Sequence, residues 1–156
     1  MTDLPILEVR RIEANIIKPI YEEMVERLGK EQAQNILGAA IEKAAIDQGK
    51  SLADGEKDGP SLRAFISLFE RWKMGGALEV GVLHEADDQF DFNITRCRYA
   101  EMYQDMGMGE IGHLLSCGRD GAFCTGYDPR IELERGQTIM GGATHCDFRY
   151  KFKNEV

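Results

Sequence analysis

The spacing of apolar residues changes once along the chain, and this change constrains the fold more than any other feature. Up to about residue 76, apolar side chains recur every three to five positions, which is typical of amphipathic helices. From Leu78 onward they alternate with other residues, as in Leu78, Val80 and Val82, which is typical of half-buried strands. The sequence therefore predicts an α+β protein in which N-terminal helices pack on a sheet.

The helical part of the chain contains three predicted helices. The first covers residues 7–28, and Pro19 inside it predicts a kink or a break into two helices. The second covers residues 31–48, where Gly49 is expected to end it, and a polar loop follows. Residues 60–76 form the third, which begins at a proline and stops at two glycines.

The second half of the chain is predicted to have the order ββ-αα-ββ. Its elements are a hairpin of strands 78–82 and 90–94, helices 97–106 and 109–117, a Gly-rich segment, and a hairpin of strands 131–139 and 145–152. We expect a mainly antiparallel sheet of about four strands with helices packed on one face. At 156 residues the chain fits a single domain, 1–156, made of a helical part (1–76) and a sheet-containing part (77–156).

The charge and hydropathy of the chain argue against several classes of partner. A formal net charge of -8 without a basic stripe is unfavourable for nucleic-acid binding. No apolar stretch approaches the roughly 20 residues of a membrane span, and the N-terminus lacks the pattern of a secretory signal. We therefore expect a cytoplasmic protein, with homo-oligomerisation left open. In that compartment its four cysteines are expected to be core residues, ligands or nucleophiles rather than disulfides.

Reactive side chains concentrate in the second half, because the helical part contains no His or Cys. His113 and Cys117 are four residues apart on a predicted helix, so an imidazole there could activate the thiol as a nucleophile. The alternative is that Cys117 is a small buried apolar residue. Asp120 lies in a Gly-bounded turn, where it is a turn former, a general base or a metal ligand.

The last predicted strand divides its reactive residues between two faces. Its buried face is expected to carry Cys146, Phe148, Tyr150 and Phe152, and its other face His145, Asp147 and Arg149. The second row offers a base, an acid and a carboxylate anchor, unless it is simply a charged outer strand face. The chain shows neither the close-paired spacing of structural zinc sites nor a nucleotide-binding fingerprint, so no metal and no cofactor are predicted.

Several short motifs in a fixed order give the sequence a family resemblance. The segments NITRCRYAEMYQDMGMGEIGHLLSCGRD and GYDPRIELERGQTIMGGATHCDFRYKF carry them. They are Cys97 followed by a short helix, Gly107, Leu-x-Cys-x-x-Asp at 115–120, Arg-x-x-Thr at 135–138, Gly141, and Cys-Asp-Phe-Arg at 146–149. Through these motifs, residues 77–152 resemble the L-2-amino-thiazoline-4-carboxylic acid hydrolase family.

The resemblance implies a hydrolase that opens a small cyclic amidine or isothiourea ring. The parent substrate would be L-2-amino-thiazoline-4-carboxylate, converted to N-carbamoyl-L-cysteine, so the expected partner is a small molecule with a carboxylate. The matching motifs carry over Cys117, Asp120, Cys146, Asp147 and Arg149 as site residues, with Cys97 and Thr138 at matching positions as well.

The chemistry of the ring assigns expected roles to these residues. Asp120 or Asp147 would hold the amidinium, and Cys117 would be a covalent nucleophile if water is not. Arg149 or Arg119 would bind the substrate carboxylate through a bidentate contact. His145 and Cys146 complete the catalytic candidates, and Thr138 is a further binding candidate. Two alternatives stay open, a non-catalytic small-molecule sensor and a metal-dependent hydrolase of a related cyclic amide.

Overall fold

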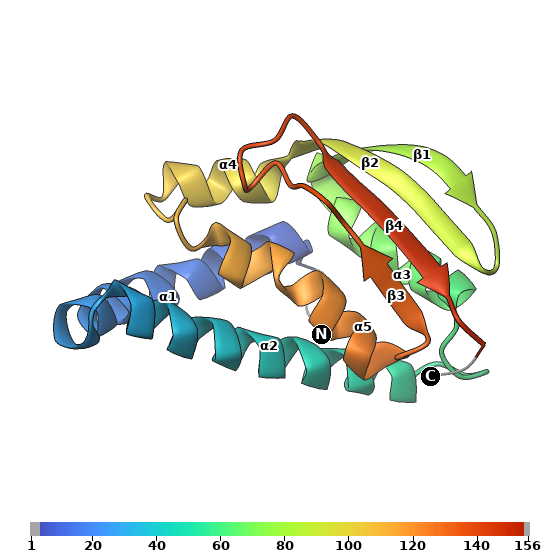
Figure 1. Cartoon of the computed structure of the whole chain (residues 1–156), viewed down its shortest axis with the longest axis horizontal. Helices are drawn as coiled ribbons and strands as arrows, with labels where there is room; N and C mark the ends of the chain where they lie inside the picture. The colour runs from blue at the N-terminus through green and yellow to red at the C-terminus, as the bar shows by residue number, and fades with distance from the viewer. Residues whose placement is uncertain (1–3, 155–156) are drawn as a thin grey trace.

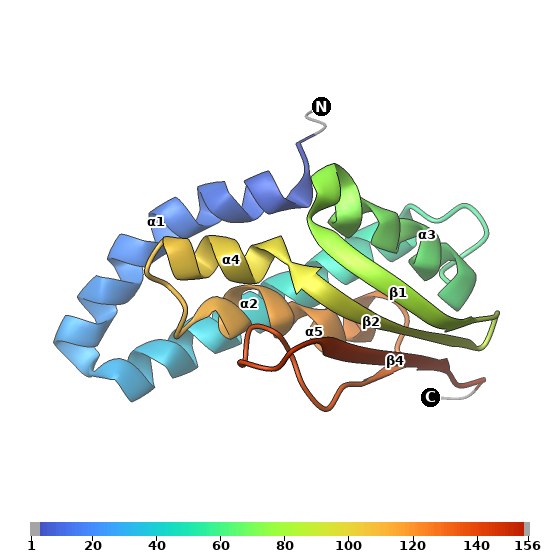
Figure 2. The same ribbon diagram turned by 90° about the horizontal axis from the view of Figure 1, so that it is seen from above.

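The computed structural model describes residues 4–154, which form five α-helices and one four-stranded antiparallel sheet (Figures 1 and 2). The helices are α1 (Ile6–Leu28), α2 (Lys30–Asp54), α3 (Leu62–Lys73), α4 (Arg98–Asp105) and α5 (Arg119–Tyr127). The strands are β1 (Leu78–Glu85), β2 (Gln89–Cys97), β3 (Ile131–Glu134) and β4 (Cys146–Phe152), in the sheet order β1-β2-β4-β3. The predicted α+β class and the ββ-αα-ββ order are confirmed.

Helix α1 continues through Pro19 as one element, so the predicted break into two helices is absent. Proline removes the hydrogen bond to the carbonyl of Asn15, but both residues lie on the exposed side, where water can replace it. The helix curves along its length in Figure 2. Gly29, with φ of 87°, then turns the chain directly into α2.

The prediction that Gly49 ends the second helix is wrong, because α2 continues to Asp54. Gly49 is instead a buried contact point with α5. A Cβ atom at Gly49 would collide with backbone atoms of Phe123 and Tyr127, and one at Gly126 would collide with the carbonyl of Ile46. The two glycines let α2 and α5 approach closely. Most of the Gly-rich segment is the helix α5, so the turn predicted at Asp120 is wrong and Asp120 lies in the first turn of a helix.

Two other elements are shorter than predicted. The helix expected at residues 109–117 is reduced to a single π-helical turn, His113–Cys117. The strand expected at 131–139 ends at Glu134, because Gly136 N and Gln137 N both donate to Asp147 Oδ1 at 2.9 Å. These amides bind a side chain rather than a neighbouring strand, so the segment leaves the sheet after β3.

The core consists of two apolar clusters that meet near the start of β1. One cluster joins α3 and α5 to the inner face of the sheet, to which Phe92, Phe148 and Tyr150 belong. The other joins α1, α2 and α4, and Trp72, Leu78 and Cys97 pack against both clusters. The alternation predicted for β4 is confirmed, since Cys146, Phe148 and Tyr150 are buried. Within residues 4–154, no helix has the length and apolar character needed to cross a membrane.

Candidate functional site

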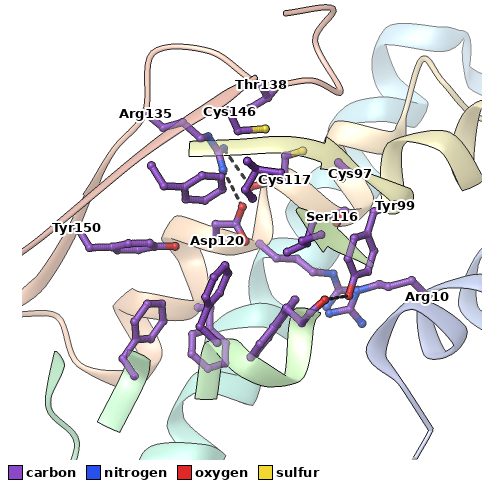
Figure 3. Close-up of a pocket in the computed structure, with 18 of the residues that line it drawn as sticks. Arg10, Cys97, Tyr99, Ser116, Cys117, Asp120, Arg135, Thr138, Cys146 and Tyr150 are labelled. Carbon is purple, nitrogen blue, oxygen red and sulfur yellow. Dashed lines mark hydrogen bonds and ion pairs between the residues drawn. The ribbon is translucent and has the colours of Figure 1, made fainter. Parts of the chain in front are cut away.

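A cavity of about 70 Å³ lies where the two apolar clusters meet (Figure 3). Every α-helix and the inner face of the sheet contribute to its wall. Since one water needs on the order of 10–15 Å³ measured in this way, the space suits a few waters or a small organic group. Its aromatic lining consists of Phe65, Phe69, Trp72, Tyr99, Phe123, Phe148 and Tyr150. Its polar lining includes three cysteines, three arginines and one aspartate.

The shortest polar contact in the wall joins Asp120 and Arg135 (Figure 3). Arg135 Nη1 donates to Asp120 Oδ2 at 2.6 Å, and Arg135 Nη2 donates to the carbonyl oxygen of Cys117 at 3.2 Å. The guanidinium also lies 5.0 Å from the ring centroid of Phe148. Asp120 stands in the first turn of α5 and Arg135 directly after β3, so the pair fixes the helix to the end of the strand.

Two opposing effects act on the pKa of the Asp120 carboxyl. Burial raises the pKa of the Asp120 carboxyl, and the charge of Arg135 opposes that rise. Burial lowers the pKa of Arg135, but the attraction of Asp120 outweighs it and the net pKa is raised. Arg135 therefore stays charged, whereas the pKa of the Asp120 carboxyl remains above that of an exposed aspartate.

Three thiols, those of Cys97, Cys117 and Cys146, line the same cavity (Figure 3). Burial, with a contribution from the charge of Asp120, raises the pKa of Cys117 to about 12. Burial also raises the pKa of Cys97 to about 11 and the pKa of Cys146 above its ordinary value. The side chains are therefore neutral thiols at neutral pH, which makes each a weak nucleophile. His113, the expected partner of Cys117, is exposed.

A second charged group lies on the α1 side of the cavity. Arg10 and Arg119 both line the cavity, and their side chains are only 5% and 12% exposed. Both contact the same carboxylate oxygen, Glu13 Oε1, at 3.1 Å from Arg10 Nη1 and at 3.6 Å from Arg119 Nη2. Arg119 Nε additionally donates to the carbonyl oxygen of Leu115 at 2.7 Å.

The structure brings together part of the site expected from the sequence. The cavity wall includes Cys117, Arg119, Asp120, Thr138 and Cys146. The remaining expected residues, His145, Asp147 and Arg149, do not line it. Arg149 donates to the carbonyl oxygens of Phe92 and Phe148 and to Asn93 Oδ1, so it ties β4 to β2 on the outer side of the sheet.

Asp147 and His145 contact the segment that follows β3. Asp147 accepts the two backbone hydrogen bonds from Gly136 and Gln137, and it thereby holds the turn that begins next to Arg135. His145 contacts the Gln137 side chain at 3.3 Å. Thr138 Oγ1 accepts from Gly141 N at 3.0 Å, which closes the next turn of the same segment.

Two charged residues of the cavity were absent from the site expected from the sequence. Arg135 stands in the Arg-x-x-Thr motif, so a signal for it was present. Arg10 carried a weaker signal, because it shares the buried face of α1 with Ala14 and Tyr21 at helical spacing. An arginine at a position with the period of the core indicates an internal partner or ligand. In the described part of the chain, no three His, Cys, Asp or Glu side chains are placed to hold a metal ion.

Comparisons with known proteins give a family and a fold. The family described as L-2-amino-thiazoline-4-carboxylic acid hydrolase matches residues 9–150. The phenol-responsive sensory domain of the transcription activator PoxR, solved with phenol, has a similar fold, with a TM-score of 0.54 at 14% identity over 97% of this chain and 76% of that chain. An H-NOX domain from Shewanella oneidensis has a TM-score of 0.42 at 13% identity, covering 92% and 76% of the two chains. No curated protein matches the chain.

Proposed function

The chain belongs to the L-2-amino-thiazoline-4-carboxylic acid hydrolase family, and from this premise we propose that it hydrolyses a small cyclic amidine or isothiourea bearing a carboxylate. The parent reaction converts L-2-amino-thiazoline-4-carboxylate and water to N-carbamoyl-L-cysteine. The observation that carries the proposal is the contact between Asp120 and Arg135 in the cavity wall. It supplies one group that can exchange a proton and one fixed cation beside it.

Asp120 is the proposed acid–base group. In its ionised form it takes a proton from water while the water oxygen attacks the amidine carbon of the protonated ring, and the C=N electron pair moves to the ring nitrogen. The tetrahedral intermediate then collapses: the bond from that carbon to the ring sulfur breaks, the sulfur receives the proton from Asp120, and the new hydroxyl loses its proton to solvent as the carbonyl forms. A carboxyl whose pKa is raised by burial suits both halves of this transfer, because it holds the proton taken from water more firmly than an exposed aspartate would until the sulfur accepts it.

Arg135 and the thiols have supporting roles in this proposal. Arg135 orients the Asp120 carboxylate and keeps an ionised fraction available, since its charge favours the ionised form. Cys117, with a pKa of about 12, supports water rather than a thiolate as the nucleophile. The three thiols form a soft, polarisable surface suited to contact with the ring sulfur.

The experiment that tests the function measures release of a free thiol from L-2-amino-thiazoline-4-carboxylate with a thiol-reactive dye. Asp120→Asn should reduce turnover by about 10²-fold or more, which is the usual effect of losing a positioned acid–base group. Asp105→Asn is the matched control, because Asp105 is an exposed aspartate at the end of α4. Absence of turnover with this substrate and with related cyclic isoureas and lactams would contradict the proposal.

A ligand-binding role without catalysis is the second candidate. It is favoured by the fold similarity to the phenol-responsive sensory domain and by the seven aromatic side chains that line the cavity. Titration calorimetry with phenol and with cyclic amidines distinguishes the two candidates. Tight binding of a compound that the protein leaves chemically unchanged would favour the sensor, whereas ring opening would favour the hydrolase.

A further inference from the structure

Arg10 and Arg119 form an end of the cavity that the proposed proton transfer does not use. Arg10 comes from α1 and Arg119 from the first turn of α5. In Figure 3, Arg10 lies beside Tyr99, on the far side of the cavity from Arg135. The cavity therefore has two cationic ends, of which only the one at Arg135 contacts an aspartate of the wall.

The charges at the Arg10 end do not balance. Glu13 Oε1 contacts both guanidinium groups, so a single carboxylate serves two cations there. Burial lowers the pKa of Arg119, and repulsion from the neighbouring cation Arg10 lowers it further. In a chain of net charge -8, two buried cations that share one carboxylate are a local feature rather than a general excess of positive charge.

One hydrogen-bond donor at this end has no acceptor. Arg10 is only 4% exposed, so water does not readily reach its side chain. Its buried Nε makes no hydrogen bond with any atom of residues 4–154. A buried donor without a partner destabilises the folded protein, so its presence suggests an acceptor that a ligand supplies. The acceptor that matches a guanidinium is a carboxylate, whose two oxygens receive two N–H groups in one plane.

We propose that Arg10 and Arg119 bind the carboxylate of the substrate, an assignment that rests on the proposed function. A carboxylate there adds the missing negative charge and accepts the free Nε–H of Arg10. Because Asp120 follows Arg119 directly in α5, a ring held by its carboxylate at this end extends toward the Asp120–Arg135 pair. The subsite thereby fixes which end of the ring meets the proton-transferring group, and it makes α1 part of the substrate-binding surface.

The test compares two ligands that differ only in the carboxylate, L-2-amino-thiazoline-4-carboxylate and 2-amino-2-thiazoline. Binding is measured by titration calorimetry in the Asp120→Asn background, which suppresses ring opening. The carboxylate should bind about 10–100-fold more tightly, since a charge-assisted hydrogen bond contributes about 1.5–3 kcal/mol. Arg10→Gln and Arg119→Gln should each remove most of this preference while leaving the affinity for 2-amino-2-thiazoline unchanged.

Arg11→Gln is the matched control, because Arg11 is the next residue of α1 and its half-exposed side chain contacts Glu8 rather than the cavity. It should keep the full preference. If Arg10→Gln fails to fold, Arg10→Lys retains the charge without the planar fork and should still lower the preference. Equal binding of the two ligands, or a preference that survives Arg10→Gln and Arg10→Lys, would overturn the subsite. A carboxylate preference without turnover in the wild type would overturn the hydrolase and leave the subsite standing.

Discussion

Replacing Arg135 by methionine removes the cation from the Asp120 pair and keeps most of the apolar contact with Phe148. At the observed 2.6 Å, a pair in an effective dielectric of 20 is worth about 6 kcal/mol before desolvation is subtracted. Removing one partner of a fully buried pair costs about 3–5 kcal/mol. The two side chains are 17% and 29% exposed, so we expect a loss of about 2–4 kcal/mol. At about 2–4 °C per kcal/mol, Tm should fall by about 4–16 °C.

The loss should depend on pH in a defined direction. Without Arg135, burial raises the pKa of Asp120 further, since the opposing charge is gone. A carboxyl whose folded-state pKa lies above its unfolded value costs stability when it is ionised, and the cost disappears below the unfolded pKa. The stability deficit of Arg135→Met should therefore be largest at neutral pH and shrink as the solution is acidified.

A double-mutant cycle with chemical denaturation measures this coupling. Asp120→Asn combined with Arg135→Met should cost less than the sum of the single changes, by about 1–3 kcal/mol. Arg96→Met is the control, because its pair with Glu101 at 3.0 Å is half exposed and should contribute less than about 1 kcal/mol. Additive single effects, or a deficit of Arg135→Met that is the same at acid and neutral pH, would refute the reasoning.

Three further predictions concern the cavity and the packing that forms it. Cys117→Ser should keep turnover within about three-fold of wild type, because a thiol with a pKa of about 12 stays protonated and is a weak nucleophile. Complete loss of turnover in a folded Cys117→Ser variant would instead favour the covalent mechanism. Gly49→Ala should lower stability to denaturant by about 1–3 kcal/mol or more, whereas Gly38→Ala on the same helix, whose Cβ meets only Leu114 at 3.4 Å, should be neutral or stabilising. Burial raises the pKa of Asp147, but the N–H groups of Gln137 and Gly136 lower this pKa by more, so its net pKa is lowered. Asp147→Asn should therefore lower the free energy of unfolding by about 1 kcal/mol at neutral pH. This deficit should disappear at acid pH, where the wild-type carboxyl is protonated.

The sequence was sufficient to predict the order of elements but not their limits. The alternation from Leu78 and in β4 requires a sheet with one buried face, so both hairpins and the inward placement of Cys146 could be predicted. Gly49 could not be interpreted correctly, because a glycine that ends a helix and a glycine that admits a neighbouring helix look the same in sequence. The difference lies in α5, whose own Gly126 permits the contact.

The family motifs predicted part of the cavity wall, and the packing of elements distant in sequence decides the rest. Asp120, Cys117 and Cys146 lie in the family motifs and also in the cavity wall. The row of His145, Asp147 and Arg149 looked like a site because its residues are reactive types on one strand face, and because Asp147 and Arg149 also lie in a family motif. Alternation separates two faces but does not say which of them borders a cavity, since that depends on helices distant in sequence. Arg10 of α1 was missed for the same reason, because its place in the cavity wall depends on helices distant in sequence.

The pH dependence of kcat/KM for ring opening tests the central claim, that Asp120 transfers the proton, most directly. In the wild type the rate should fall as the solution is acidified, with the midpoint above the pKa of an ordinary aspartate, because burial raises the pKa of Asp120 and only the ionised form accepts the proton from water. Arg135→Met should move the midpoint to higher pH, and Asp120→Asn should abolish this limb and lower the rate by about 10²-fold or more. An Asp120→Asn protein that keeps the wild-type limb and rate would contradict the account.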